Sequence, residues 1–69
     1  AVDAWNNKGL ALVQQGNYDE ASRAFNNAIE FNPQYAKAWA GKAFALQSLG
    51  RTTEADAVLA KAEELGFTG

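Results

Sequence analysis

The sequence predicts an all-α fold in which two antiparallel helical hairpins, four helices in all, stack as a short α-α superhelix, or solenoid. Three observations support this prediction. The chain repeats itself at an offset of 34 residues, the apolar residues of each unit recur at helical spacing, and a glycine separates the two segments of each unit. Composition agrees, because alanine is abundant and there is a single proline.

The repeat depends on identities that keep their register along the chain. Ten positions coincide at this offset: Ala4/Ala38, Trp5/Trp39, Lys8/Lys42, Ala11/Ala45, Leu12/Leu46, Gly16/Gly50, Glu20/Glu54, Ala21/Ala55, Ala28/Ala62 and Glu30/Glu64. Three more pairs keep apolar bulk: Leu10/Phe44, Phe25/Leu59 and Phe31/Leu65. Two copies of one structural unit therefore follow each other, and we expect the boundary to separate residues 1–34 from residues 35–69.

Start and stop signals place the helices at about 2–15, 18–31, 34–49 and 52–65. Gly16 and Gly50 lie where a helix end favours left-handed backbone geometry. Asn17, followed three residues later by Glu20, predicts an N-cap with a capping-box partner. In the second unit we expect Thr52 or Thr53 to provide a weaker cap, because Arg51 stands in the place of Asn17 and cannot perform its role.

The two remaining junctions carry their own signals. Asn32 and Pro33 end the first hairpin, and the proline is expected at the first position of the third helix. Gly66 is expected to cap the fourth helix, with Phe67 folding back onto its last turn. The second unit thus ends in a C-terminal cap.

Small residues alternate with large ones in a way that favours close helix packing. The small set is Gly9, Ala21, Ala28, Ala43, Ala55 and Ala62, and the large set is Trp5, Leu12, Phe25, Trp39, Leu46 and Leu59. Such pairing lets two antiparallel helices nest and then lets one hairpin stack on the next. Aromatic side chains at helical spacing are usually core, so we assign these residues to structure.

These residues resemble a known repeat family. The series Trp5, Gly9, Leu12, Tyr18, Ala21, Phe25, Ala28 and Pro33 is similar to the tetratricopeptide repeat in spacing and residue type, and the second unit repeats it more loosely. The resemblance covers residues 2 to about 67. Thr52 and Phe67 replace the tyrosine and the closing proline of the pattern, so we expect the second unit to be the last repeat.

Lysine departs from the pattern at the same place in both units. Lys8 and Lys42 stand where the family usually has leucine. We expect their aliphatic stems to cover apolar surface while the ammonium groups reach water or a carboxylate.

The resemblance implies that the first helix of each hairpin lines a concave groove that binds peptides. In this sequence the groove stripe holds Asp3, Asn6, Asn7, Leu10, Val13, Gln14, Lys37, Ala40, Gly41, Phe44, Gln47 and Ser48. Side-chain amides in the stripe suit a peptide backbone, since each can donate and accept. Leu10 and Phe44 either mark a contact site or pack on each other as satellite core, and the sequence leaves both readings open.

Composition excludes several classes of function. There is no cysteine and no histidine, which excludes disulfides, zinc sites and thiol or imidazole catalysis, and no cofactor motif is present. The eight carboxylates fit caps and solvated helix faces, so we expect no enzyme activity. A net charge of −2 without a basic run argues against nucleic acid, and no stretch is long and apolar enough for a membrane span. A cytoplasmic location fits this composition.

Two functional hypotheses remain, with a third less favoured. The first is a non-catalytic protein–protein interaction scaffold that binds a peptide or partner protein in the groove. The alternative is self-assembly into a homodimer or hairpin-exchanged oligomer, because Trp5 at one end and Val58, Ala62 and Leu65 at the other would lack cover. Exchange would use the Asn32–Tyr35 connection. The acidic balance disfavours a related hairpin repeat that reads RNA bases.

Two further expectations concern the setting of the module. Tetratricopeptide domains that grip acidic chaperone tails use converging cations, whereas Asn6, Leu10 and Gly41 stand at the relevant places here, so that subtype is not expected. The chain begins Ala1-Val2 without methionine, which suggests a domain taken from a larger protein.

Overall fold

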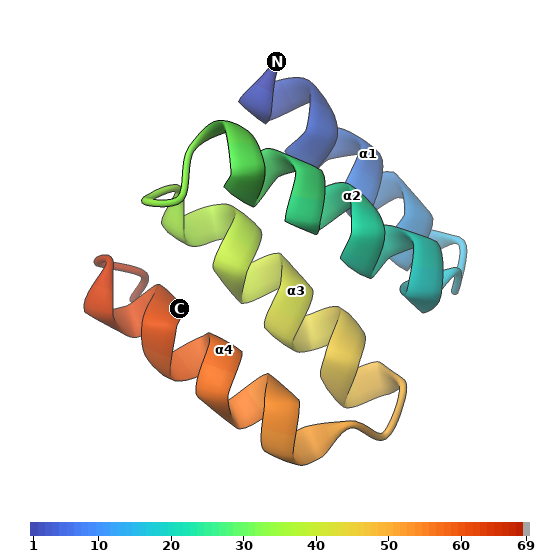
Figure 1. Ribbon diagram of the computed structural model, residues 1–69. Helices are drawn as coiled ribbons and strands as arrows, with labels where there is room; N and C mark the ends of the chain where they lie inside the picture. Colours follow the sequence, from blue (N-terminus) through green and yellow to red (C-terminus); the bar gives the residue numbers. More distant parts are fainter. Residues whose placement is uncertain (69) are drawn as a thin grey trace.

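The computed structural model describes residues 1–68, and these form four α-helices in two antiparallel hairpins. Helix α1 spans Val2–Gln14, α2 spans Tyr18–Phe31, α3 spans Ala36–Ser48 and α4 spans Thr52–Glu64 (Figure 1). Helix α1 packs on α2 and α3 packs on α4, while α3 also packs against α2 and, less extensively, against α1. The predicted all-α arrangement of two stacked hairpins is confirmed.

Three glycines end helices by the same hydrogen-bonding device. Gly16, Gly50 and Gly66 have φ values of 77°, 81° and 107°, which side-chain-bearing residues rarely adopt. In each case the next residue donates its backbone N–H to a carbonyl five residues earlier, as from Asn17 to Leu12 at 2.9 Å and from Phe67 to Ala62 at 3.0 Å. These bonds turn the chain sharply at predicted positions.

The N-termini of α2 and α4 correct the capping prediction. Asn17 occupies the predicted N-cap position of α2, whereas Arg51, and not Thr52 or Thr53, is the N-cap of α4. Neither N-cap side chain bonds to the helix backbone. The Asn17 side-chain amide instead donates to Glu20 at 3.1 Å, and Arg51 pairs with Glu54 at 2.9 Å. Both units thus use a side-chain pair spanning the first turn, and Arg51 performs the same role as Asn17.

Helix α3 begins later than predicted, because Asn32 holds the chain in a turn. The Asn32 side-chain oxygen accepts the backbone N–H of Gln34 at 3.1 Å, and its carbonyl accepts that of Tyr35 at 3.0 Å. Pro33 therefore lies in the turn rather than at the first helical position. Its carbonyl accepts the indole N–H of Trp39 at 2.7 Å, which fixes the turn against α3.

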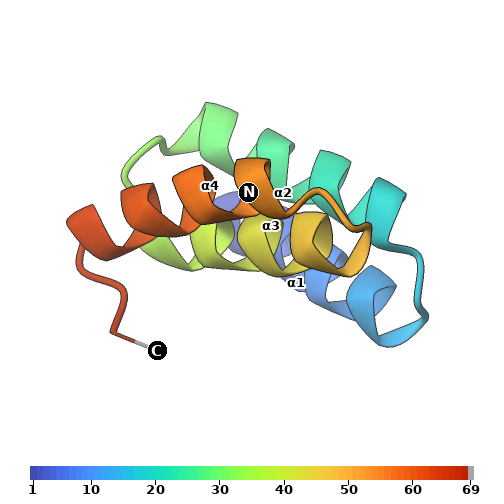
Figure 2. The same cartoon turned by 90° about the horizontal axis from the view of Figure 1, so that it is seen from below.

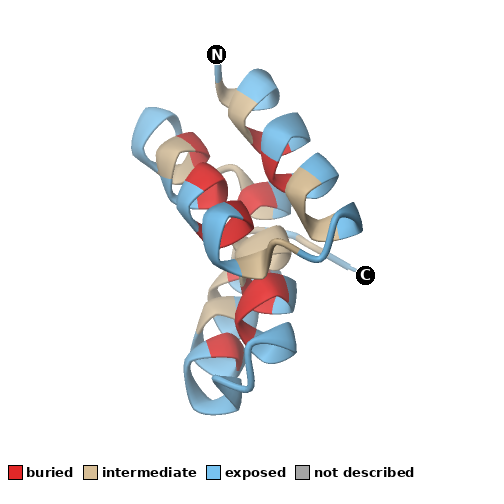
Figure 3. Ribbon diagram, turned by 90° about the vertical axis from the view of Figure 1, so that its right-hand side faces the viewer, coloured by how far each residue is buried: buried red, intermediate tan, exposed pale blue. Residues whose placement is uncertain are grey.

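The core is centred on Phe25, whose ring lies between two glycine backbones. Phe25 is fully buried, and a Cβ added to Gly9 of α1 or to Gly41 of α3 would come within 2.6 Å or 2.5 Å of its ring. Alanines of α2 and α3 complete this cluster, and buried residues lie along the facing sides of the helices (Figure 3). The predicted meeting of small residues with large ones is confirmed here.

The predicted exposure of the solenoid ends is right in part. Trp5, Val58 and Leu65 are only half-buried, as expected for terminal hairpins. Ala62 is fully buried, so its predicted lack of cover is wrong. A methyl group on the inner side of α4 is small enough for α3 to cover it without a further hairpin.

The two lysines of the repeat lie over tryptophans of their own helices. The Lys8 ammonium is 5.2 Å from the centre of the Trp5 ring, and that of Lys42 is 6.0 Å from the Trp39 ring. Both pairs have the geometry of cation–π contacts, which are worth about 0.5–1 kcal/mol at exposed sites. Lysine at this position therefore has a structural role.

Candidate functional site

Helices α1 and α3 form one face of the molecule, and the C-terminal tail leaves α4 and turns toward that face (Figure 2). A hollow of about 370 Å³ opens there, which we call the groove hollow; its lining is Asn6, Leu10, Lys37, Ala40, Gly41 and Phe67. Five of these six residues belong to the predicted groove stripe. The inter-hairpin packing brings them together from two helices that lie more than 20 residues apart in sequence.

Asn6, which lines the groove hollow, has a buried polar atom without a hydrogen-bond partner among the described residues. It is only 6% exposed, and its side-chain oxygen accepts no hydrogen bond within residues 1–68. A buried acceptor without a donor costs about 1–3 kcal/mol. The second unit avoids this cost by having Ala40 at the equivalent position. The oxygen itself is covered, so a bound molecule can donate an N–H to it only after the Asn6 side chain turns toward the hollow.

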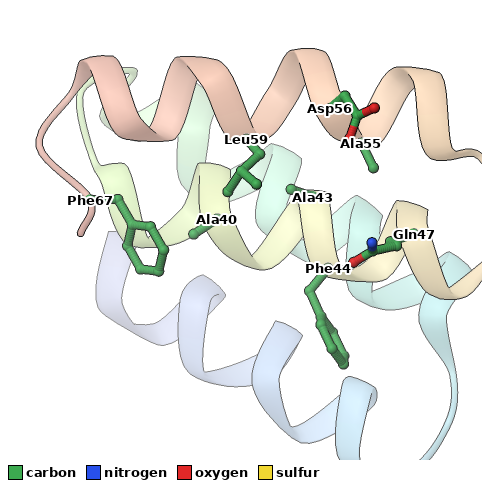
Figure 4. A pocket seen from close by; sticks show the side chains of 8 residues that line it. All are labelled: Ala40, Ala43, Phe44, Gln47, Ala55, Asp56, Leu59 and Phe67. Atoms are coloured by element: carbon green, nitrogen blue, oxygen red, sulfur yellow. The ribbon is translucent and has the colours of Figure 1, made fainter. Parts of the chain in front are cut away.

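Leu10 lines the groove hollow and Phe44 lies outside it, and we call these two exposed apolar side chains the ridge. They are 45% and 52% exposed, and the Phe44 ring contacts the edge of Tyr18 at a centroid separation of 6.4 Å. Phe44 points away from α4 and toward α1 (Figure 4). Side chains this exposed are not satellite core, so their exposure argues against that alternative. The ridge remains available for contact.

Phe67 was not among the predicted groove residues, although it lines the hollow. The left-handed backbone of Gly66 reverses the chain after α4, and the bond from the Phe67 N–H to Ala62 holds the tail in place. Its ring then lies beside Ala40 (Figure 4). The predicted Gly66 cap was the sequence signal that could have located Phe67. It specifies where the chain turns, but not which face of the molecule the Phe67 ring contacts.

A second hollow, which we call the end hollow, lies between α3 and α4. It measures about 230 Å³, and its lining is Ala40, Ala43, Phe44, Gln47, Ala55, Asp56, Leu59 and Phe67 (Figure 4). Of the predicted groove stripe, only Ala40, Phe44 and Gln47 belong to it. The end hollow faces the open side of the second hairpin, where no helix of the described chain packs.

The other predicted groove residues have different surroundings. Asp3 accepts a hydrogen bond of 2.8 Å from the Tyr35 hydroxyl, which links the two hairpins. This bond, together with partial burial and the charge of Asp3, raises the pKa of Tyr35 above its usual 10.0. Val13 packs against the core cluster. Asn7, Gln14 and Ser48 are exposed and line neither hollow.

The charged groups of the described residues are arranged as surface pairs. Arg23 with Asp19, Arg51 with Glu54 and Lys61 with Glu64 form exposed ion pairs within single helices. Such pairs contribute about 0–1 kcal/mol each. No three potential ligand side chains of residues 1–68 gather into a metal-binding group, and none of their helices is long and apolar enough to span a bilayer.

Comparison with known proteins adds a family. Residues 2–35 match the tetratricopeptide repeat, and a second match to a tetratricopeptide repeat covers residues 24–57. An uncharacterized protein of Methanocaldococcus jannaschii is 48% identical over 48 residues. That alignment covers 70% of this chain and 56% of the relative, so the chain spans little more than half of the relative's length.

Proposed function

We propose that this chain, which belongs to the tetratricopeptide repeat family, is a non-catalytic scaffold that binds a peptide segment of a partner protein in the groove hollow. Repeats of this family generally mediate protein–protein interactions. The observation that carries the proposal is the buried, unpaired side-chain oxygen of Asn6 in a hollow with otherwise largely apolar walls. A peptide backbone supplies the N–H that this oxygen lacks, once the Asn6 side chain turns toward the hollow.

The lining of the groove hollow indicates the chemistry of the segment. Leu10 and Phe67 favour an apolar or aromatic side chain, which buries apolar area at about 25 cal/mol per Å². Exposed Lys37 at the rim favours a neighbouring carboxylate. We therefore expect an extended segment with an apolar anchor, a backbone N–H directed at Asn6, and an acidic residue nearby.

The exposure of Leu10 indicates that packing of the two hairpins leaves this surface free for a partner. The first hairpin is covered by the second, yet Leu10 remains 45% exposed. Stacking of hairpins therefore leaves this ridge open, and the ridge is available in every unit of a longer array.

A peptide selected from a displayed random library against the immobilised chain serves as the probe. Its affinity, measured by calorimetry, should fall about tenfold or more in a Leu10→Ala/Phe44→Ala variant whose helicity is unchanged. The matched control is Leu49→Ala/Phe31→Ala, which removes a leucine and a phenylalanine of similar exposure, 38% and 62%, that line neither hollow. The control should bind like the wild type.

Asn6→Ala separates binding from stability. Removing the unpaired oxygen should raise the free energy of unfolding by about 1 kcal/mol, and removing the acceptor should weaken peptide binding about tenfold. Equal losses in the groove and control variants, or full affinity in Asn6→Ala, would show that the peptide binds elsewhere. Unfolding of the Leu10→Ala/Phe44→Ala variant would show that these residues are core and that the site is misassigned.

A further inference from the structure

The contact between the two hairpins shows how a helix of this chain docks on a hairpin. Helix α3 presents a stripe of small residues, Ala38, Gly41 and Ala45, to the first hairpin. The two alanines are fully buried in the same cluster as Phe25, and the Gly41 backbone lies directly against the Phe25 ring. This interface has two halves. Small residues of the docking helix form the half that we call the arriving stripe, and the hairpin that the helix covers contributes a large residue to the half that we call the receiving surface.

Helix α1 carries the same stripe, and no helix of residues 1–68 packs over it. The residues 34 positions before Ala38, Gly41 and Ala45 are Ala4, Asn7 and Ala11. All three are exposed, although the two alanines are identical to their buried counterparts. The first hairpin thus presents the arriving half of the interface to solvent.

The second hairpin presents the receiving half. Leu59 and Asp56 occupy the places that Phe25 and Ser22 occupy in the first hairpin. Phe25 is fully buried and Ser22 is 8% exposed beneath their covering helix, whereas Leu59 is 38% exposed and Asp56 is also exposed. Both line the end hollow, so the end hollow is the uncovered equivalent of the seat that α3 occupies (Figure 4).

We propose that the end hollow binds α1 of a second copy of this chain, repeating the contact of α3 with the first hairpin. The two halves of the interface are different surfaces at opposite ends of one molecule. Such a heterologous contact adds copies head to tail, continuing the solenoid from chain to chain. Leu10 stays exposed under the same contact within the chain, so this association leaves the groove open.

The sizes of the facing residues fit this docking. A Cβ at Gly41 would lie 2.5 Å from the Phe25 ring, so only glycine is accepted opposite phenylalanine. Asn7 stands at the Gly41 position on α1, and Leu59 stands at the Phe25 position in the end hollow. Leucine lacks the outer atoms of the phenyl ring, which leaves room for a side chain at this place. Relative to the contact within the chain, the residue on the arriving helix is larger and the residue that it faces is smaller.

One residue of the receiving surface opposes docking. Asp56 places a carboxylate where the covered hairpin has the nearly buried hydroxyl of Ser22. Covering a carboxylate without a partner is unfavourable, so the association is weak and concentration-dependent. Replacing Asp56 with serine, as at the equivalent position, removes this opposition.

Sedimentation velocity over a concentration series tests the proposal. The wild-type chain should show a weight-average mass that rises continuously beyond that of a dimer, and Asp56→Ser should show the same rise at about tenfold lower concentration. Ala11→Arg, which enlarges the arriving stripe, should remain monomeric. The control is Ala57→Arg on the exposed side of α4, since Arg23 already occupies the equivalent place, and it should associate like the wild type.

A mixing experiment tests the head-to-tail geometry. Asp56→Arg blocks the receiving surface, and Ala11→Arg blocks the arriving stripe; each variant alone should be monomeric with unchanged helicity. Mixed together they retain one intact surface each, so they should form a heterodimer and nothing larger. A wild-type chain that stays monomeric at every concentration, or a closed dimer that survives both substitutions, as hairpin exchange would give, overturns the proposal.

Discussion

Gly9→Ala should destabilise the chain, although alanine is the better helix former. The substitution gains roughly 1 kcal/mol of helix propensity. The new Cβ would lie 2.6, 2.7 and 2.9 Å from three atoms of the Phe25 ring, whereas carbon atoms prefer about 3.5–4.0 Å. The overlap is thus on the order of 1 Å against three atoms.

The Phe25 ring has little room to retreat from this overlap, because it is fully buried and the Gly41 backbone of α3 lies equally close to two of the same ring atoms. We therefore take the upper part of the range for overpacking, about 3 kcal/mol, against the gain of about 1. The net loss is about 2 kcal/mol, which lowers the melting temperature of a domain this size by roughly 8–16 °C.

Urea denaturation followed by circular dichroism measures this loss, at concentrations where the chain is monomeric. The same Gly9→Ala change in a Phe25→Leu background should be neutral or stabilising by up to about 1 kcal/mol, because the second unit already pairs Ala43 with Leu59. Asn26→Ala, an exposed helical control, should stabilise slightly. If Gly9→Ala alone leaves stability unchanged or raises it, the ring is not confined between the two helices.

Three further changes probe the turns and the inter-hairpin bonds. Gly50→Ala should cost about 1 kcal/mol in urea titrations, through its φ of 81° and not through a clash, since its Cβ would meet open space. The stability that Tyr35 contributes is present below pH 10.0 and is lost as the pH rises through its raised pKa. Asp3→Asn should lower the pKa of Tyr35, measured by a tyrosinate absorbance titration. An unchanged pKa would show that Asp3 is not the cause of the shift. Trp39→Phe, which frees the Pro33 carbonyl, should lower the melting temperature by several degrees.

The helices and their stops could be predicted because their causes are local in sequence. Gly16, Gly50 and Gly66 each end a helix where a left-handed residue was expected, since only glycine adopts that geometry without strain. The start of α3 was misplaced by two residues, because the side chain and carbonyl of Asn32 accept the N–H groups of Gln34 and Tyr35 and hold these residues in a turn.

The surroundings of the site residues could not be predicted, because they depend on how the helices pack and not on the local sequence pattern. The groove stripe identified Asn6 and Leu10, but helical periodicity does not reveal that the Asn6 oxygen would be buried without a donor. Asn7 shares the stripe by sequence, yet it faces the open side of α1 with Ala4. The position of Phe67 depends on how far the tail reverses after Gly66, which sequence spacing does not determine.

Mapping of backbone amide shifts on the isotope-labelled chain tests most directly whether the α1–α3 face binds a partner segment. On addition of the library-selected peptide, we expect the largest shifts at Asn6, Leu10, Lys37 and Gly41, with little change around Phe31 on the far side. Shifts concentrated at Phe31 and Asn27, with those four amides unmoved, would contradict it.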